Sequence, residues 1–355
     1  FRKVDNATQG HVTFCMDIVR ASNWEEFKAA LSNIKTPIWN WGYVDKDGNI
    51  GLKVNGLIPI RKNSDGMAPV PGWTGEYEWE GMIPFDELPS RYNPDEGFIV
   101  TANHAVVDDV YPYLIGLDWD RGYRAQRITE MIQARDRISS EDIRNIQGDN
   151  KSLSAGEIIP YLTRLEPQDA KLRDALGRLA AWDGQEHKDS AEAALFEAFW
   201  THLLPALWDE LPEDLQFTGG SYEMVLVRDL LTQPEDVWWD DGRTAQVESR
   251  DDILQRALAE GIAWLEEELG DDVDDWRWGD VHHATFANQS LGQSGIGPIE
   301  AIFNRGPIPA SGGSSIVNAT SWSTDDPAVV QGVPSERMIL DLSDWARSQS
   351  MHTTG

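Results

Sequence analysis

The order of strand-like and helix-like segments is the feature that most constrains the fold of this chain. Residues 1–120 are mostly strand-like, residues 121–275 carry apolar side chains at helical spacing, and residues 276–355 return to strand and loop character. A long helical block between two β-rich blocks favours an α+β fold with a large inserted helical region. We therefore expect three parts with these boundaries.

The N-terminal part of the first block contains two local signals. Residues 11–20 form a largely apolar run that predicts a buried strand, with Cys15 as a buried thiol. Asn23 has the side chain of a helix N-cap, and Glu26, three residues on, is a suitable capping-box partner. We therefore expect a helix to begin directly after Asn23.

Three strands are expected in the rest of the first block. Residues 39–44 and 50–54 carry strand-like side chains, and the Asp- and Gly-containing segment 45–49 between them predicts a tight turn. Residues 97–102 form another apolar, β-branched run that leads into Asn103.

The middle block shows helical periodicity. One apolar face carries side chains three and four residues apart, namely Leu172, Ala175, Leu176, Leu179 and Trp182. Residues 194–200 and 253–258 predict further helices. From about residue 281 the pattern becomes strand-like again.

Charge and hydropathy exclude two classes of partner or location. The 60 acidic and 30 basic residues give a net charge of −30, which repels a phosphate backbone, so we expect no nucleic-acid partner. No run of 18 apolar residues occurs, so no transmembrane segment is expected. The acidic excess fits either a solubilising surface or adaptation to high salt.

Several short motifs resemble functional sites but fit structural roles better. Residues 45–49 resemble the start of a calcium loop, but Ile50 and Gly56 occupy the positions that require Gly and Glu. Residues 271–275 form an acidic run that indicates a solvated loop. His282 and His283 have no third ligand at metal-site spacing, so we expect packing or surface roles.

Two carboxylates allow a different enzymatic interpretation. Glu76 and Glu78 are two residues apart around a strand-like segment, so they would share one face of a strand and could act as a glycosidase pair. Exposed strand carboxylates explain the same pattern. No single motif in the sequence supplies a complete catalytic set.

Five segments between Trp39 and Ile132 together point to one enzyme family. They are residues 40–51, 69–79, 83–89, 97–103, and 111–113 followed by 123–128. In this order they resemble the penicillin acylases, a family of N-terminal-nucleophile hydrolases. Weaker likeness continues through residues 181–184, 276–280, 317–319 and 337–341, so the resemblance covers most of the chain.

The resemblance implies a fold, a mechanism and partners. The fold would be the four-layer αββα sandwich of N-terminal-nucleophile hydrolases. In that family a precursor cleaves itself, and the serine that opens the β-subunit attacks an amide carbonyl, with its own α-amino group as base. That serine is expected in a segment preceding Phe1, so an upstream β segment and an α-subunit would be partners. The family also implies a periplasmic or secreted location.

Three residues take roles from the resemblance. Asn103 matches the side-chain donor of the oxyanion hole, and a carboxamide N–H suits the alkoxide of a tetrahedral intermediate. Arg124 matches the arginine that supports the amino end of the nucleophile and Asn103, with Arg127 as the neighbour most easily confused with it. Trp39 matches a wall residue of the acyl pocket.

The resemblance requires no cofactor, although it allows a structural calcium ion. The family's calcium site would take a carbonyl near Gly66 and a carboxylate after Asn103, for which Asp108 or Asp109 is a candidate.

The predicted function is hydrolysis of an N-acyl amide whose acyl group is held in an apolar pocket. Penicillin-type β-lactams, N-acyl-homoserine lactones and acylated lipopeptides all contain such a bond, and the sequence does not choose among them. A non-catalytic acidic binding protein that retains the fold is the alternative from another class.

Overall fold

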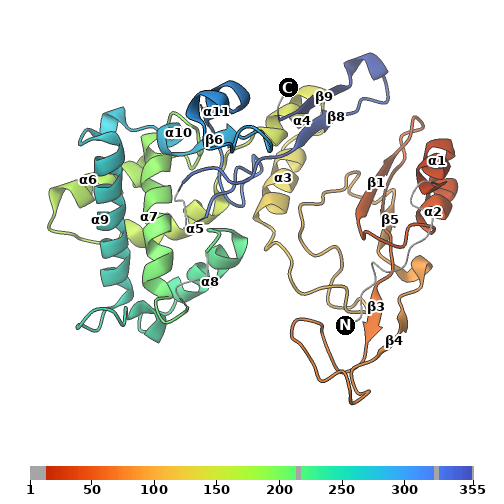
Figure 1. Cartoon of the computed structure of the whole chain (residues 1–355), viewed down its shortest axis with the longest axis horizontal. Helices are drawn as coiled ribbons and strands as arrows, with labels where there is room; N and C mark the ends of the chain where they lie inside the picture. Colours follow the sequence, from red (N-terminus) through yellow and green to blue (C-terminus); the bar gives the residue numbers. More distant parts are fainter. Residues whose placement is uncertain (1–12, 213–216, 324–327, 354–355) are drawn as a thin grey trace. The chain divides into compact units, whose positions relative to one another are not determined.

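The computed structural model describes residues 13–212, 217–323 and 328–353. The chain divides into two compact units. The first unit comprises Phe1–Asp120 with Leu342–Trp345, and the second comprises Arg121–Asp341 with Ala346–Gly355. Figure 1 labels their helices and strands.

The first unit combines short helices with short strands. Its elements are α1 (Thr13–Arg20), α2 (Trp24–Leu31), β1 (Asn40–Val44), β2 (Ile50–Val54), β3 (Pro59–Arg61), β4 (Trp79–Met82), the 3-10 helix η2 (Phe85–Glu87) and β5 (Ser90–Tyr92). One antiparallel sheet has the order β1-β2-β5, and β3 pairs antiparallel with β4.

The β1–β2 hairpin confirms the turn predicted at residues 45–49. Val44 pairs with Ile50 across the hairpin. Asp45 Oδ1 accepts hydrogen bonds from the backbone N–H groups of Asp47 and Asn49, at 2.9 and 3.0 Å. The carboxylate therefore serves the turn itself, as Asp commonly does in tight turns.

Helix α2 begins after Asn23 as predicted, but the predicted capping box is wrong, because Glu26 bonds to Ser22 instead of returning to the Asn23 N–H. The Asn23 side chain accepts a hydrogen bond from the Glu26 N–H at 3.0 Å, while the Glu26 carboxylate accepts one from the Ser22 N–H at 2.8 Å. The helix buries Trp24, which stacks on Tyr92 of β5 with 5.1 Å between ring centroids. Gly51 of β2 makes room for this ring, because a Cβ there would lie 2.6 Å from it.

The strand predicted over residues 11–20 is wrong, since Thr13–Arg20 forms α1. Cys15 is exposed rather than buried. In a helix the apolar side chains of this run point in different directions, so Ile18 packs against the Trp24 cluster while Val19 is 80% exposed. A short apolar run does not by itself distinguish a strand from a helix.

The strand predicted over residues 97–102 is also wrong. The Gly97 N–H closes a turn onto the Pro94 carbonyl at 2.9 Å, and residues 98–101 have no regular secondary structure. A strand needs a neighbouring strand to complete its hydrogen bonds, and none of the sheets formed by described residues includes this segment.

The second unit is mostly helical. Its helices are α3 (Tyr123–Gln133), α4 (Ser140–Gln147), α5 (Leu153–Leu162), α6 (Ala170–Ala181), α7 (Ala191–Leu207), α8 (Ser221–Leu231), η3 (Val237–Trp239), α9 (Arg250–Leu269), η4 (Val273–Asp275), α10 (Trp278–Val281) and α11 (Gly297–Phe303). Its strands are β6 (His283–Phe286), β7 (Arg305–Pro309), β8 (Glu336–Ile339) and β9 (Gln349–His352), and they form two antiparallel pairs, β6 with β7 and β8 with β9. The 3-10 helix η5 (Trp345–Arg347) begins at the last residue of the first unit.

These elements confirm the helical spacing read from the sequence. Leu172, Ala175, Leu176 and Leu179 are the buried residues of α6. The segments predicted at 194–200 and 253–258 lie inside α7 and α9, and strands return at β6.

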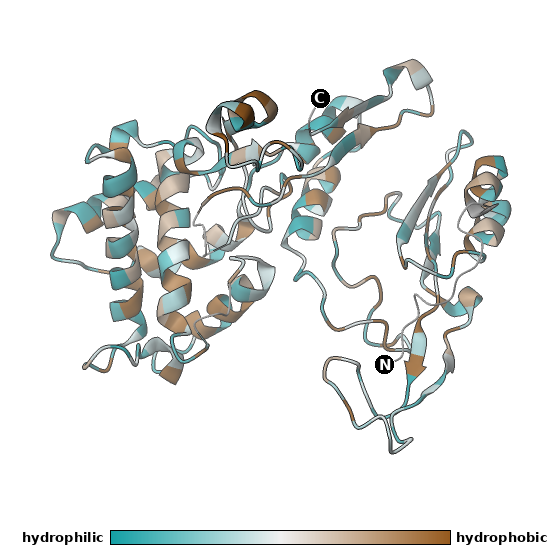
Figure 2. Ribbon diagram, viewed as in Figure 1, coloured by the Kyte–Doolittle hydropathy of each residue, from teal (hydrophilic) through white to brown (hydrophobic). Residues whose placement is uncertain are grey.

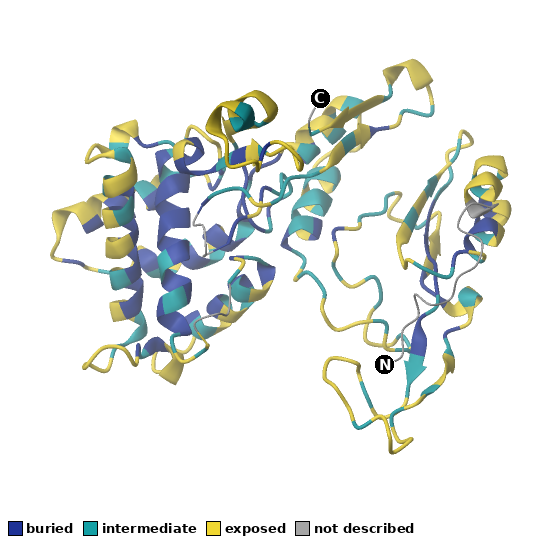
Figure 3. Cartoon of the chain, viewed as in Figure 1, coloured by how far each residue is buried: buried dark blue, intermediate teal, exposed yellow. Residues whose placement is uncertain are grey.

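Helix α7 is the centre of the second unit. It is apolar on all sides and almost entirely buried, as a helix surrounded by protein must be, and Figure 3 shows it dark blue along its length. Helix α9 packs along it, and Figure 1 shows the two side by side. At their crossing Gly261 of α9 faces the backbone of Ala198 and Phe199.

Tryptophans fill much of the remaining core of the second unit. Those that are at most 2% exposed are Trp200, Trp239, Trp276, Trp278 and Trp322. Each indole N–H has an acceptor, as buried tryptophan requires, and the Trp278 N–H donates to the Gly312 carbonyl at 2.9 Å. No helix in the described part of the chain is both long and apolar enough to cross a membrane.

Gly261→Ala should destabilise the protein. The new Cβ would lie 2.8 Å from the Ala198 carbonyl carbon, so one helix must move away from the other. We expect a loss of about 1–3 kcal/mol, as for other overpacked cores. The midpoint of urea-induced unfolding of the full-length protein measures it.

Gly177→Ala on α6 is the matched control. A Cβ at Gly177 meets nothing within 4 Å, so only the helix propensity changes, and stability should rise by about 0.5–1 kcal/mol. Equal effects of the two substitutions would contradict the close-packing argument.

Candidate active site

Trp39 lies directly before β1 in the first unit. Its N–H donates to the Asn55 side-chain oxygen at 2.8 Å, and its carbonyl accepts from the Asn55 N–H at 3.3 Å. Its ring meets Trp41 edge-on with 5.7 Å between centroids and is 48% exposed. The backbone of Trp39 is therefore fixed, while its ring has an open face.

Asn55 holds this region together, although no sequence pattern pointed to it. The side chain is fully buried, and its oxygen also accepts from the Trp41 indole N–H at 3.0 Å. Its amide group donates to the carbonyls of Ile34 and Pro37, at 3.3 and 3.0 Å. Because every polar atom of the side chain has a partner, Asn55 fixes the start of β1.

Lys53 of β2 is a second buried polar residue that was not predicted. It is 1% exposed, and its ammonium group donates to the carbonyls of Phe85 and Leu88, at 2.7 and 2.8 Å. Burial lowers the pKa of Lys53 to about 8. These bonds join β2 to the segment that includes η2.

Asn103 lies in an irregular loop of the first unit. Its φ of 65° is in the left-handed region, which Asn adopts more readily than most residues with a side chain. Its carbonyl accepts a hydrogen bond from the Asp120 N–H at 3.0 Å, and the residue is exposed. A specific backbone conformation thus presents this carboxamide at the surface of the unit.

Arg124 lies in the first turn of α3, in the second unit. The helix starts after Gly122, whose φ of 95° suits glycine, and it is anchored by the buried residues Tyr123 and Ala125. The Tyr123 hydroxyl donates to Glu157 at 2.6 Å. Arg124 itself is half-buried.

Arg127 has a different and structural role. Its guanidinium forms a bidentate pair with the buried Asp149, with N–O distances of 2.8 and 2.9 Å. Burial acts to raise the pKa of Asp149, but the hydrogen bonds and charge of Arg127 hold that pKa below its usual value. This arginine therefore stabilises a buried carboxylate, and the role of Arg124 stays a prediction from the resemblance.

The structural interpretations of the other motifs hold. His282 is buried, stacks on Trp278 with 4.3 Å between centroids, and bonds to Thr320 Oγ1 at 2.9 Å, while burial lowers its pKa to about 4. Asp271, Asp272, Asp274 and Asp275 are exposed, as a solvated run would be.

The glycosidase interpretation loses its structural basis. It required Glu76 and Glu78 to share the face of a strand, but both precede β4 and both are exposed. The strand begins only at Trp79, because the preceding residues form turns around Gly72 and Gly75.

The residues suggested for calcium do not form a metal site by themselves. Asp108 Oδ1 already accepts a hydrogen bond from the Val110 N–H at 3.2 Å. Among the residues whose positions are described, no group of three or more His, Cys, Asp or Glu side chains could hold a metal ion. The calcium ion stays a prediction from the resemblance.

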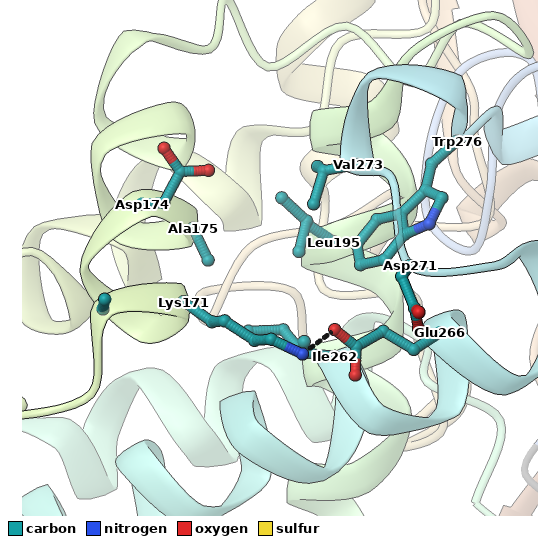
Figure 4. Close-up of a pocket in the computed structure, with 10 residues that line it drawn as sticks. Lys171, Asp174, Ala175, Leu195, Ile262, Glu266, Asp271, Val273 and Trp276 are labelled. Carbon is teal, nitrogen blue, oxygen red and sulfur yellow. Dashed lines mark hydrogen bonds and ion pairs between the residues drawn. The ribbon is translucent and has the colours of Figure 1, made fainter.

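A pocket of about 260 Å³ lies wholly within the second unit. Its lining residues lie between Ala170 and Trp276 in the sequence. Figure 4 shows its apolar floor, made by Leu195, Val273 and Trp276, and the Lys171–Glu266 ion pair at one side. None of Trp39, Asn103 and Arg124 lines it.

Comparisons with known proteins give a consistent result. An acyl-homoserine lactone acylase, QuiP, of Pseudomonas aeruginosa is 30% identical over 100% of this chain and 46% of its own length. A penicillin acylase 2 proenzyme of Pseudomonas sp. strain SE83 is 28% identical over 87% of this chain and 40% of its own length. The chain thus spans less than half the length of these relatives.

A solved structure and a family model agree with these relatives. The thermostable penicillin G acylase of Alcaligenes faecalis superimposes with a TM-score of 0.57 at 25% identity, over 75% of this chain and 54% of that one. The mixture of helices and small sheets is therefore similar to that of a penicillin G acylase. The sequence model of penicillin amidase matches residues 6–355, and the chain belongs to the penicillin amidase family.

Proposed function

We propose that the full-length protein is an amidohydrolase that cleaves N-acyl amides through an acyl-enzyme. The observation that carries this proposal is the match of the penicillin amidase family model over residues 6–355. Similarity to acyl-homoserine lactone acylases and penicillin acylases supports it, because both names specify an enzyme that acts on an acylated compound.

The proposed nucleophile is an N-terminal serine outside the residues of this chain. Its hydroxyl attacks the amide carbonyl while its α-amino group takes the hydroxyl proton. The tetrahedral intermediate collapses to an ester, and the amine leaves with that proton. Water then attacks the ester by the same route and releases the carboxylic acid.

Asn103 is the proposed oxyanion donor. Negative charge develops on the carbonyl oxygen only as the tetrahedral intermediate forms, so a fixed neutral N–H donor stabilises the transition state more than the substrate. The left-handed backbone and the bond to Asp120 support this role, because strained, fixed conformations are common at functional sites. Arg124 is proposed to support Asn103 and the amino end of the nucleophile.

The complete fold is proposed to be the four-layer αββα sandwich, built jointly with an upstream β segment and an α-subunit. The small sheets of two or three strands support the proposal, because such sheets bury little apolar surface alone. Exposed apolar side chains support it as well: Trp73 is 89% and Val110 is 86% exposed. Helix α11 is brown in Figure 2 and yellow in Figure 3, so it is both apolar and exposed.

Two further proposals rest on the family resemblance alone. One is an extracytoplasmic location, periplasmic or secreted. The other is a structural calcium ion near Gly66 and Asp108 or Asp109, with its remaining ligands supplied by other segments of the full-length protein.

A pair of substrates tests which leaving amine the enzyme prefers. The mature full-length enzyme is assayed with a penicillin and with an N-acyl-homoserine lactone that carry the same acyl group. Most of the sequence similarity is to enzymes named for the lactone, so we expect the higher kcat/KM with it. A mature protein that opens with Ser yet hydrolyses no N-acyl amide would favour the non-catalytic alternative.

Asn103→Gly should lower kcat by roughly 10²–10³, about 2.7–4 kcal/mol, with a smaller effect on KM. Glycine keeps the left-handed backbone, so this substitution removes the carboxamide without the strain that alanine would add. Asn103→Asp should be at least as damaging, because a carboxylate repels the oxyanion. Steady-state kinetics measure both, after a gel confirms that each precursor has matured.

Asn63→Gly is the control for the backbone. Asn63 also has a left-handed φ, 52°, and its side-chain amide donates to the Glu76 carbonyl at 3.1 Å. We expect its kcat to stay near wild type. A matured Asn103→Gly enzyme with a kcat like that of the control would show that Asn103 is only a turn residue.

Trp39→Ala should favour bulkier acyl groups. Because half of the residue is exposed, we expect its truncation to destabilise the protein by less than the ~3–5 kcal/mol of a buried tryptophan. The measurement is the ratio of kcat/KM for long and short acyl substrates. Trp345→Ala, at a more exposed tryptophan of the first unit, should leave that ratio unchanged, and an unchanged ratio in Trp39→Ala would remove Trp39 from the acyl pocket.

A further inference from the structure

Two glutamates meet in the core of the second unit. Glu186 follows the β-bridge between Lys151 and Gln185, and Glu197 lies in the middle of α7. They are 0% and 2% exposed, and both Glu186 oxygens are buried without a donor among the described residues. The two carboxyl groups lie close enough to shift the pKa of each other, as a hydrogen bond between them would. Two carboxyl groups form such a bond only when one of them carries a proton, because an ionised carboxylate has no donor.

The surroundings of the pair supply few other partners. The Trp322 indole N–H donates to Glu197 Oε2 at 2.8 Å. Within the described part of the chain, no N–H or O–H group forms a hydrogen bond of normal geometry with either Glu186 oxygen. The nearby Ser152 hydroxyl acts only to lower the Glu186 pKa, against the larger effect of burial. No Lys, Arg or His of the described residues forms a salt bridge with either glutamate.

Titratable groups on the surrounding elements interact with other partners. Asp149 pairs with Arg127, and the ammonium group of Lys151 bonds to the Asp183 carbonyl. The remaining groups and their partners are His187 with Asn150, Glu192 with Ser190, His202 with the Ala198 carbonyl, Glu157 with Tyr123, Arg256 with Asp241 and Glu248, and His282 with Thr320. Among the described residues, no cation therefore compensates the negative charge of the glutamate that is ionised.

The segment from Gly312 to Trp322 packs over the pair. The Gly312 N–H donates to the Glu186 carbonyl at 2.8 Å. At Gly313 a Cβ would lie 2.3 Å from Glu186 Oε2, so only glycine fits there. Through these contacts and the Trp322 bond, the two glutamates join this segment to α7.

A charged buried pair would be costly. An ionised carboxyl group loses several kcal/mol of hydration when it is buried, and a second negative charge in contact adds repulsion. A proton or a metal cation could relieve both effects. Calcium requires six to eight oxygen ligands, and these two side chains belong to no larger acidic cluster in the part of the chain that is described.

We propose that Glu186 and Glu197 form a buried proton-binding site, in which one shared proton holds the segment from Gly312 to Trp322 against α7. The site is separate from the proposed catalytic residues. When the pair loses this proton, the contact between that segment and α7 weakens.

The direction of the pH effect follows from linkage. Burial raises the pKa of Glu186, the neighbouring Glu197 raises it further, and burial also raises the pKa of Glu197. Between the unfolded and folded pKa values the folded state therefore holds a proton that the unfolded state has lost. Stability from this proton is complete at acidic pH and is lost as the pH rises through the raised pKa.

Glu186→Gln in the full-length protein tests the proposal. The amide keeps a donor toward Glu197 and cannot lose it, so the difference in Tm between variant and wild type should grow in favour of the variant from about pH 5 to about pH 9. Glu267→Gln, at an exposed glutamate of α9, is the charge-matched control and should follow the wild-type pH dependence. Parallel curves for wild type and Glu186→Gln would overturn the proposal.

Two measurements on the wild-type protein keep the test decisive if the variant does not fold. Infrared spectra should show the C=O stretch of a protonated carboxyl group at neutral pH, and this band should disappear in the pH range where Tm falls. Its absence at neutral pH would overturn the proposal. Elemental analysis before and after dialysis against EDTA shows whether the site holds a metal ion instead of a proton. A stoichiometric metal whose removal lowers Tm and abolishes the pH dependence would overturn the proposal in favour of a metal site.

Discussion

Gly261 allows α9 to approach α7 so closely that a single added methyl group would touch the backbone of Ala198. The rest of the second unit follows from this contact. Because α9 covers one side of α7 and the neighbouring helices cover the others, α7 can be apolar around its whole circumference. Glu192 and His202 of α7 are only half-buried, whereas Glu197 in the middle of the helix is 2% exposed, and this is why Glu197 requires a partner from another segment.

The first unit depends on buried polar groups in another way. Asn55 satisfies all of its hydrogen bonds with backbone groups and one indole, and Lys53 uses carbonyl oxygens near η2. Such networks fix one arrangement of short strands that contribute little stability alone. Trp39 owes its position to Asn55, so its partly open ring is held by a side chain that contacts no proposed reacting group.

Patterns that involve neighbouring residues could be predicted from the sequence. The hairpin at residues 45–49, the cap at Asn23 and the apolar face of α6 all depend on side chains close together in the chain. The errors at residues 11–20 and 97–102 have a different origin, because a strand depends on a distant partner that no local pattern reveals. For the same reason Asn55 and Lys53 were missed, since their partners lie 14 to 35 residues away in the sequence. The Glu186–Glu197 pair was missed because the fold brings together two residues from different elements. The roles of Asn103, Arg124 and Trp39 came from the family resemblance. The structure adds the local conformation of each residue and the ion pair of the neighbouring Arg127 with Asp149.

The distribution of tryptophan determines what fluorescence reports in this protein. The second unit holds Trp200, Trp239, Trp276, Trp278 and Trp322 in its interior and exposes Trp238, whereas the first unit buries Trp24 and exposes Trp39 and Trp73. Buried indoles change their surroundings on unfolding, while exposed indoles already contact water. A shift of the emission maximum therefore follows mainly the opening of the helical unit, and quenching by a soluble ion follows mainly the accessibility of the first. One chain thus contains two optical probes that can be followed at the same time.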